Sequence, residues 1–132
     1  MILVDTSAWV QFFRRQGERG AKERVAAALS SDAAGFTCPV LLELLAGARL
    51  PAEIDLVLET LGLCTRYYFA AEYWERAAHM ERTLRQRGFV VPRDDILVAT
   101  VACECRLPLM CRDAHFGLIH DHGDRSLKLE CV

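Results

Sequence analysis

The chain has 132 residues, of which 52% are hydrophobic and 26% charged, so its length and composition predict one globular domain over residues 1–132. They exclude disordered and collagen-like chains. The 16 Lys and Arg against 18 Asp and Glu give a net charge of −2, which excludes a polycation that coats nucleic acid but allows a local basic face. No signal peptide is evident and no apolar run approaches the roughly 20 residues of a membrane span, so we expect a cytoplasmic protein with no membrane partner.

Hydrophobic periodicity and turn residues predict the order of elements along the chain. The expected strands lie at residues 2–4, 35–38, 63–69, 107–111 and 126–131, and the expected helices cover residues 9–13, 21–29, 40–46, 51–61, 70–87 and 96–102. A polar loop with His120, Asp121 and His122 is expected before the last strand. Strands that alternate with helices are typical of an α/β fold, so we predict a central, mainly parallel sheet flanked by helices.

Four carboxylates occupy places where ligands bind in such folds, beyond the carboxyl ends of parallel strands. Asp5 follows the first strand directly, and Asp113 follows the strand at residues 107–111. Glu43 interrupts an apolar helix, and Asp95 opens the most apolar helix of the chain. We expect all four to converge on one edge of the sheet.

Each acid also has an ordinary structural explanation. Asp5 could cap a helix, Asp113 could start a turn, and Asp95 could interact with a helix dipole. Glu43 could pair with an arginine. Four carboxylates together, however, would raise each other's pKa values unless a cation lay between them, and Mg²⁺ or Mn²⁺ suits such oxygen ligands.

The segments around these acids resemble a PIN-domain ribonuclease, and most of all the toxins of VapC-type toxin–antitoxin pairs. The resemblance rests on Asp5-Thr6-Ser7 after an apolar strand, on residues 40–47, on residues 95–99 and on residues 107–116. It implies a three-layer PIN-like fold and Mg²⁺- or Mn²⁺-dependent endonucleolytic hydrolysis of RNA, leaving 5′-phosphate and 3′-hydroxyl ends. It also implies a homodimer and a VapB-type antitoxin that lays an apolar segment into a groove, for which the apolar helices of residues 40–61 are suited.

The resemblance assigns the catalytic, metal-binding role to Asp5, Glu43, Asp95 and Asp113. Asp94 falls one position early in the family pattern and is predicted to be a helix N-cap. The hydroxyls of Thr6 and Ser7 are expected to bond a carboxylate or a metal-bound water, although Thr6 could equally be a cap. Where some relatives carry a further acid, two residues after Asp113, this chain has His115.

An RNA substrate also needs basic side chains around the acids. The candidates are Arg112, Arg93, Arg14 and Arg15, and Arg112 is expected to contact phosphate or a site carboxylate. The alternative for each is a solvated helix face. Trp9, Phe12 and Phe13 could stack on bases, but their helical spacing favours core or partner contacts.

Other readings of the same residues are weaker. A haloacid-dehalogenase-like phosphatase would need a second Asp where Ser7 stands, and a receiver-like domain would need an Asp after its third strand. A catalytically silent PIN-fold scaffold that binds RNA or protein is the main alternative.

His115, His120 and His122 beside Asp121 could form a transition-metal site, although surface histidines are the simpler explanation. The six cysteines are expected to be reduced thiols rather than metal ligands.

Overall fold

The computed structural model describes residues 1–132 and contains five short strands, seven α-helices and two other helical turns. The strands are β1 (Ile2–Val4), β2 (Ala34–Thr37), β3 (Thr65–Tyr67), β4 (Leu109–Cys111) and β5 (Leu129–Cys131). The α-helices are α1 (Thr6–Phe13), α2 (Arg19–Ser30), α3 (Cys38–Gly47), α4 (Pro51–Gly62), α5 (Trp74–Gln86), α6 (Arg93–Glu104) and α7 (Ala114–Leu118). The remaining turns are a 3-10 turn, η1 (Ala71–Tyr73), and a π-helical turn, η2 (Ile119–Gly123).

The five strands form one sheet in the order β3-β2-β1-β4-β5, and every pairing is parallel, which confirms the predicted α/β architecture. The chain moves outward from β1 through β2 to β3, then returns to β4 on the other side of β1. In open parallel sheets, such a reversal leaves a crevice beyond the carboxyl ends of the two central strands. The residues that directly follow β1 and β4 therefore stand where this fold class binds ligands.

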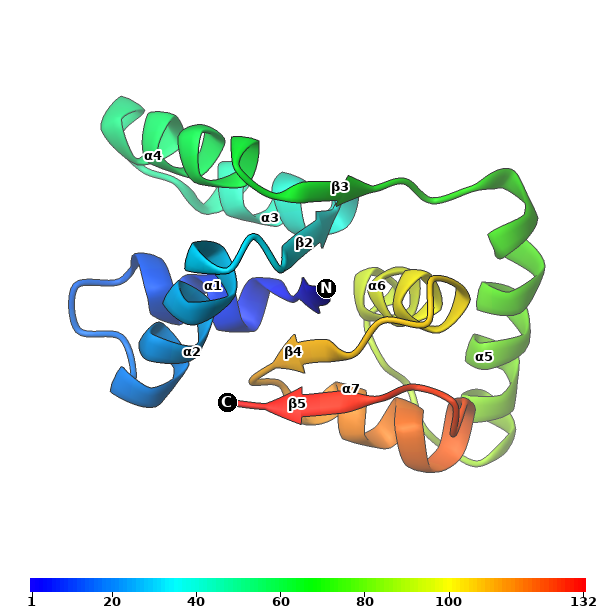
Figure 1. The fold of residues 1–132 in the computed structure, drawn as a ribbon. Helices are drawn as coiled ribbons and strands as arrows, with labels where there is room; N and C mark the ends of the chain where they lie inside the picture. The colour runs from blue at the N-terminus through cyan, green and yellow to red at the C-terminus, as the bar shows by residue number, and fades with distance from the viewer.

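Burial explains why these segments form a sheet covered by helices. All three residues of β1 and all three of β4 are buried, as expected for parallel strands with helices on both faces. Figure 1 shows α1 and α2 on one side of the sheet and α5 and α6 on the other. The apolar helix α6 is buried from Val98 to Cys103, as predicted from its sequence. Trp9 is fully buried, and Phe12 and Phe13 pack against the core rather than forming an open stacking surface.

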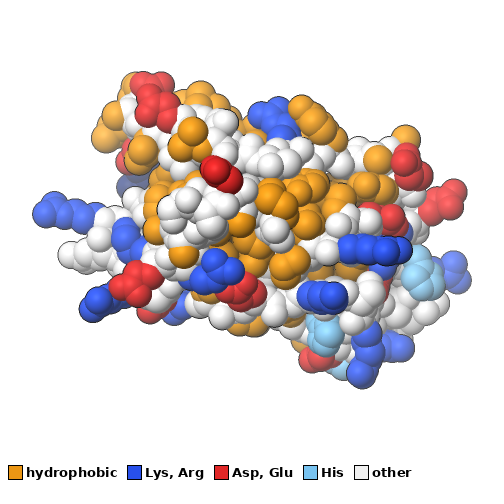
Figure 2. All heavy atoms as spheres, in the orientation of Figure 1, with side chains coloured by type: hydrophobic (Ala, Val, Ile, Leu, Met, Phe, Trp, Pro, Cys, Tyr) orange, Lys and Arg blue, Asp and Glu red, His pale blue; other side chains and the backbone are white.

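The surface carries exposed apolar side chains on and around α4. Figure 2 shows apolar side chains gathered across the middle of one face, with Lys and Arg mainly toward its periphery. A shallow cavity of about 250 Å³ lies between α3, α4 and the β2–β3 edge. The large exposed apolar residues of this region are Leu42, Leu50, Ile54, Leu56, Leu58 and Leu63. None of the helices is both long and apolar enough to cross a membrane.

The structure corrects three expectations about local structure. The region with His120 and His122 is helical rather than a polar loop, because α7 runs directly into η2. The expected helix over residues 70–87 is divided into η1 and α5. The strand expected at residues 63–69 is reduced to Thr65–Tyr67, because α4 extends to Gly62.

Candidate metal centre

Asp5 is the first residue after β1 and caps the N-terminus of α1. Its Oδ2 accepts hydrogen bonds from the Ser7 backbone N–H at 2.9 Å and from the Ser7 hydroxyl at 2.5 Å. The same Ser7 Oγ accepts a bond of 2.9 Å from the backbone N–H of Arg112, just beyond β4. Ser7 therefore links the ends of the two central strands and holds the Asp5 carboxylate in place.

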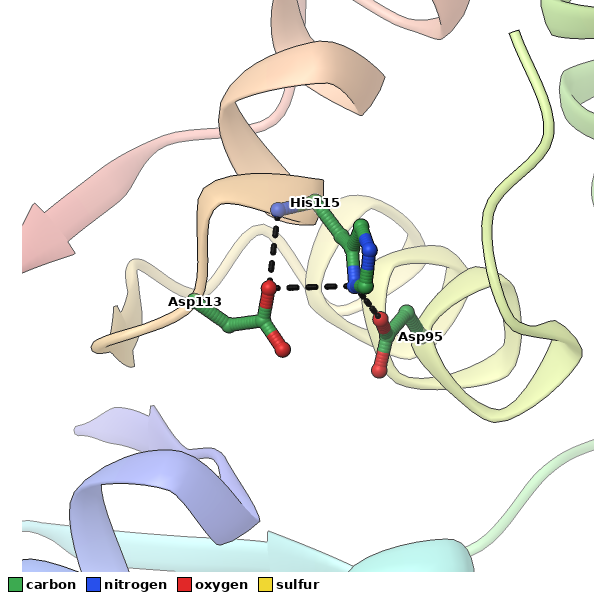
Figure 3. Close-up of side chains that lie close together, drawn as sticks. All are labelled: Asp95, Asp113 and His115. Carbon is green, nitrogen blue, oxygen red and sulfur yellow. Dashed lines mark hydrogen bonds and ion pairs between the residues drawn. The ribbon is translucent and has the colours of Figure 1, made fainter.

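Asp113, Asp95 and His115 form a contiguous group beside Asp5. Asp113 caps α7, where its Oδ1 accepts a hydrogen bond of 2.9 Å from the backbone N–H of His115. The Nδ1 atom of His115 lies 3.0 Å from Asp113 Oδ1 and 3.0 Å from Asp95 Oδ2. Figure 3 shows the three side chains pointing toward one another from the first turns of α6 and α7 and the end of β4. One potential ligand atom from each of the three lies within 4.8 Å of the others.

Glu43 and Asp94 complete the acidic face of this site. Glu43 lies on α3, which packs against both α1 and α6. Burial raises the pKa of Glu43, and the charges of Asp5, Asp94 and Asp113 raise it further, so Glu43 lies within electrostatic range of these three acids. The prediction that Asp94 is an N-cap is wrong: α6 begins at Arg93 with Pro92 as its N-cap, which places Asp94 inside the first turn.

Three carboxyl groups of the site, those of Asp5, Glu43 and Asp95, have raised pKa values. Burial raises the pKa of Asp5, outweighing the hydrogen bonds from Ser7 that favour the ionised form. Burial also raises the pKa of Asp95 to about 7, with contributions from the charges of Asp5 and Asp113 that His115 only partly offsets. The site therefore holds several carboxylates that resist being ionised at the same time without a cation.

These residues fit a divalent cation by the chemistry of their donors. None of Asp5, Glu43, Asp94, Asp95 and Asp113 forms an ion pair with a lysine or arginine, and His115 is the single basic side chain in contact with the group. Carboxylate oxygens are the preferred ligands of Mg²⁺, and Mn²⁺ accepts oxygen and nitrogen together. The missing positive charge is thus of the kind that a bound metal ion supplies.

The two hydroxyls predicted for the site differ in their surroundings. Ser7 bonds the Asp5 carboxylate, whereas Thr6 is the first residue of α1 and not its cap. The Thr6 hydroxyl is close enough to lower the pKa of Glu43, yet its Oγ1 is buried without a partner in hydrogen-bonding geometry.

The four arginines proposed from the sequence lie outside this group. Arg112 donates a hydrogen bond to the Val132 carbonyl and lies 3.6 Å from Glu18, so its guanidinium does not pair with a site carboxylate. Arg93 forms an exposed ion pair with Glu81. Arg14 and Arg15 are exposed in the turn after α1 and form no ion pair.

The histidines separate into two groups. His120 contacts the Leu127 carbonyl and the His122 ring stacks on Phe89, so neither joins His115 in a three-histidine metal site. Sequence reasoning noted His115 but did not predict its contacts with Asp95 and Asp113. The contact with Asp113 could have been predicted because His115 lies two residues after Asp113, which caps α7. At that position the imidazole can face the capping carboxylate.

Comparison with known proteins identifies the family to which this fold belongs. A family model described as "PIN domain" matches residues 2–119. The chain belongs to the PIN-domain family. Within it, the chain is similar to the ribonuclease VapC11 of Mycobacterium tuberculosis, with 37% identity over 90% of this chain and 91% of that protein.

Solved PIN-domain structures share the fold. The chain aligns with VapBC2 from Rickettsia felis, described as bound to a promoter DNA fragment, with a TM-score of 0.81 at 19% identity over 100% of this chain and 99% of that one. It aligns with FitAcB from Neisseria gonorrhoeae with a TM-score of 0.78 at 18% identity, covering 98% of this chain and 96% of that one. The three-layer PIN-like fold inferred from the sequence is thereby confirmed.

Proposed function

We propose that the chain is an endoribonuclease that hydrolyses RNA phosphodiester bonds with Mg²⁺ or Mn²⁺ held by Asp5, Glu43, Asp95 and Asp113, and that it is the toxin of a toxin–antitoxin pair. The observation that carries the proposal is an acid cluster at the reversal point of the sheet that contains no arginine or lysine partner. The VapC ribonucleases at 37% identity support the choice of RNA as substrate.

The chemistry requires no nucleophilic side chain. When bound, divalent ions at such a site polarise the phosphodiester, lower the pKa of bound water and stabilise the leaving oxygen, which yields 5′-phosphate and 3′-hydroxyl ends. The protein keeps its ligands in place: Ser7 orients Asp5, and the N-terminal turn of α7 orients Asp113. Fixed ligands reduce the reorganisation needed when substrate arrives.

RNA must approach an acidic centre, so basic side chains near its rim are part of the proposal. Arg14, Arg15, Arg93 and Arg112 stay the candidates, and all four are exposed. Of these four arginines, Arg112 is the nearest in sequence to a proposed metal ligand, because it directly precedes Asp113. Its backbone N–H also donates a hydrogen bond to Ser7. We expect it to contact a phosphate rather than a carboxylate.

A VapB-type antitoxin and a homodimer belong to the same proposal. The solved relatives include complexes described as VapBC. The exposed apolar side chains of α4 and the cavity beside Leu41 and Leu61 offer a surface on which an apolar antitoxin segment can be buried. A cytoplasmic location stays a prediction.

The test is cleavage of an end-labelled RNA pool by purified protein with Mg²⁺, with Mn²⁺ and with chelator. Asp5→Asn is the inactive variant, and Asp121→Asn, which makes the same change at an exposed site, is the matched control. We expect metal-dependent cuts with 5′-phosphate ends in the wild type and in Asp121→Asn, and none in Asp5→Asn. Cleavage in chelator, or equal cleavage by Asp5→Asn, contradicts the proposal. Metal binding without cleavage of any RNA favours the silent scaffold.

A further inference from the structure

His115 is the one nitrogen donor in a site otherwise made of carboxylates. The inference that follows rests on the proposed function, since it concerns the same cation. His115 lies at the start of α7, and its backbone N–H bonds the Asp113 side chain, which fixes the position of the residue relative to the acids. Its side chain is 40% exposed, so a metal ion and its waters can reach the ring.

The spacing of the donor atoms suits coordination to one ion. His115 Nδ1 lies 3.0 Å from an oxygen of Asp95 and 3.0 Å from an oxygen of Asp113. Adjacent ligands of an octahedral ion with bonds near 2.1 Å are separated by about 3.0 Å. The nitrogen already lies at that separation from each of the two oxygens. One further oxygen on each carboxylate is not hydrogen-bonded within the protein.

We propose that His115 is a ligand of the divalent ion through Nδ1, and that this nitrogen makes the site favour Mn²⁺ over Mg²⁺. Mg²⁺ prefers oxygen ligands only, whereas imidazole is a good ligand for first-row transition metals. An all-carboxylate set would select less strongly between the two ions. His115 is thus a selectivity-determining ligand in addition to the acids.

The first test is direct and does not depend on RNA cleavage. Pulsed electron paramagnetic resonance of the Mn²⁺-loaded protein detects ¹⁴N bonded to the metal. We expect ¹⁴N coupling in the wild type and in His79→Asn, which changes an exposed histidine on α5, and its loss in His115→Asp. Bound Mn²⁺ without ¹⁴N coupling in the wild type overturns the role of His115 while leaving the metal site intact.

The second test compares affinities by calorimetric titration with Mn²⁺ and Mg²⁺. His115→Asp gives the site an all-oxygen ligand set. We therefore expect the ratio of Mn²⁺ affinity to Mg²⁺ affinity to fall by about tenfold, with Mg²⁺ binding retained. His115→Gln, which cannot supply the imidazole nitrogen, is expected to lower Mn²⁺ affinity and checks that the added charge is not the cause. An unchanged ratio in both variants contradicts the proposal, and absence of Mn²⁺ binding by the wild type contradicts both this proposal and the proposed function.

Discussion

Two clusters of half-buried acids in this molecule differ in whether the protein supplies their positive charge. In one, Arg76 on α5 donates hydrogen bonds of 2.9 and 3.1 Å to Asp124 and lies 3.3 Å from Glu104. Burial alone would raise the pKa of Asp124, but hydrogen bonds from Ser126 and Arg76 outweigh it and the pKa is lowered. In the other cluster, around Asp5 and Asp95, no arginine or lysine is present and the pKa values are raised.

The difference separates a structural cluster from a candidate binding site. Arg76 joins α5, α6 and the segment before β5, and its acids are satisfied within the fold. The acids after β1 and β4 are held in position by Ser7 and by a helix cap but remain short of positive charge. Such a group can accept an external cation, and the predictions below test the difference between the two clusters.

The largest expected effect is at Asp95. Because its carboxylate contacts His115 and feels the charges of Asp5 and Asp113, Asp95→Asn is expected to lower RNA cleavage by about 100-fold or more. Asp94→Asn, at the Glu43 side of the site, is expected to cost about tenfold. Initial rates of cleavage at saturating Mn²⁺ measure the effects of both substitutions. A larger loss in Asp94→Asn than in Asp95→Asn would show that Asp94, and not Asp95, is the metal-binding acid.

A bound cation should stabilise the fold. At a concentration 100 times its Kd, Mg²⁺ or Mn²⁺ is expected to add about 2.7 kcal/mol to the free energy of unfolding. This corresponds to a rise in Tm of roughly 5–10 °C in a domain of this size. Differential scanning calorimetry should show the rise in the wild type and in Arg76→Met but not in Asp113→Asn. A rise of the same size in Asp113→Asn would place the cation elsewhere.

Removing Arg76 should affect stability alone. Arg76→Met leaves Asp124 and Glu104 without their cation, so the free energy of unfolding is expected to fall by about 1–2 kcal/mol. Metal affinity and RNA cleavage should not change. Urea denaturation and Mn²⁺ titration of the same preparation measure the two properties, and a loss of metal affinity would mean that the two clusters are coupled.

The two clusters should respond to pH in opposite directions. The folded-state pKa of Asp95 is raised from 3.8 to about 7, so the folded chain keeps a proton that the unfolded chain releases between these values. Without metal, this contribution makes stability fall as pH rises from about 4 to about 7. The pKa of Asp124 is instead lowered from its ordinary value of 3.8, so the ionised Asp124 stabilises the fold above pH 3.8. This contribution is lost as the pH falls from 3.8 through the lowered pKa.

Urea denaturation in chelator from pH 4.5 to 7.5 measures the Asp95 contribution. We expect a flatter dependence of the unfolding midpoint on pH in Asp95→Asn and the wild-type slope in Asp121→Asn. A wild-type slope retained in Asp95→Asn would show that the acid cluster does not carry the effect.

The smallest effect is expected at Arg93. Its ion pair with Glu81 is exposed and screened by solvent, so Arg93→Gln should leave the free energy of unfolding almost unchanged. If Arg93 contacts RNA, the KM for cleavage should rise while kcat stays constant. A fall in kcat with unchanged KM would instead connect Arg93 to the first turn of α6 and its acids.

The sequence predicts the parallel sheet and the places of the acids because both depend on local patterns. Three consecutive apolar residues before Asp5 and a similar run before Asp113 define β1 and β4, and parallel strands bring their carboxyl ends together. The spacing within α3 and α6 then directs Glu43 and Asp95 to the same edge.

The details that could not be predicted depend on three-dimensional contacts. The helical turns around His120 carry no strong periodic pattern, and in the structure this segment continues α7 and packs against α5. Arg112 pairs with Glu18, a residue on a distant segment, so its position beside Asp113 in the sequence could not predict this partner. Its contact with a phosphate stays a prediction. Likewise, the contact between His115 and Asp95 exists only once α6 and α7 are packed together.

The most direct test of whether the acids after β1 and β4 form a cation site is a calorimetric titration of the metal-free protein with Mn²⁺. The account predicts saturable binding by the wild type and by Asp121→Asn, and an affinity lower by about 10- to 100-fold or more in Asp5→Asn. Equal binding by wild type and Asp5→Asn, or no binding by either, would contradict it.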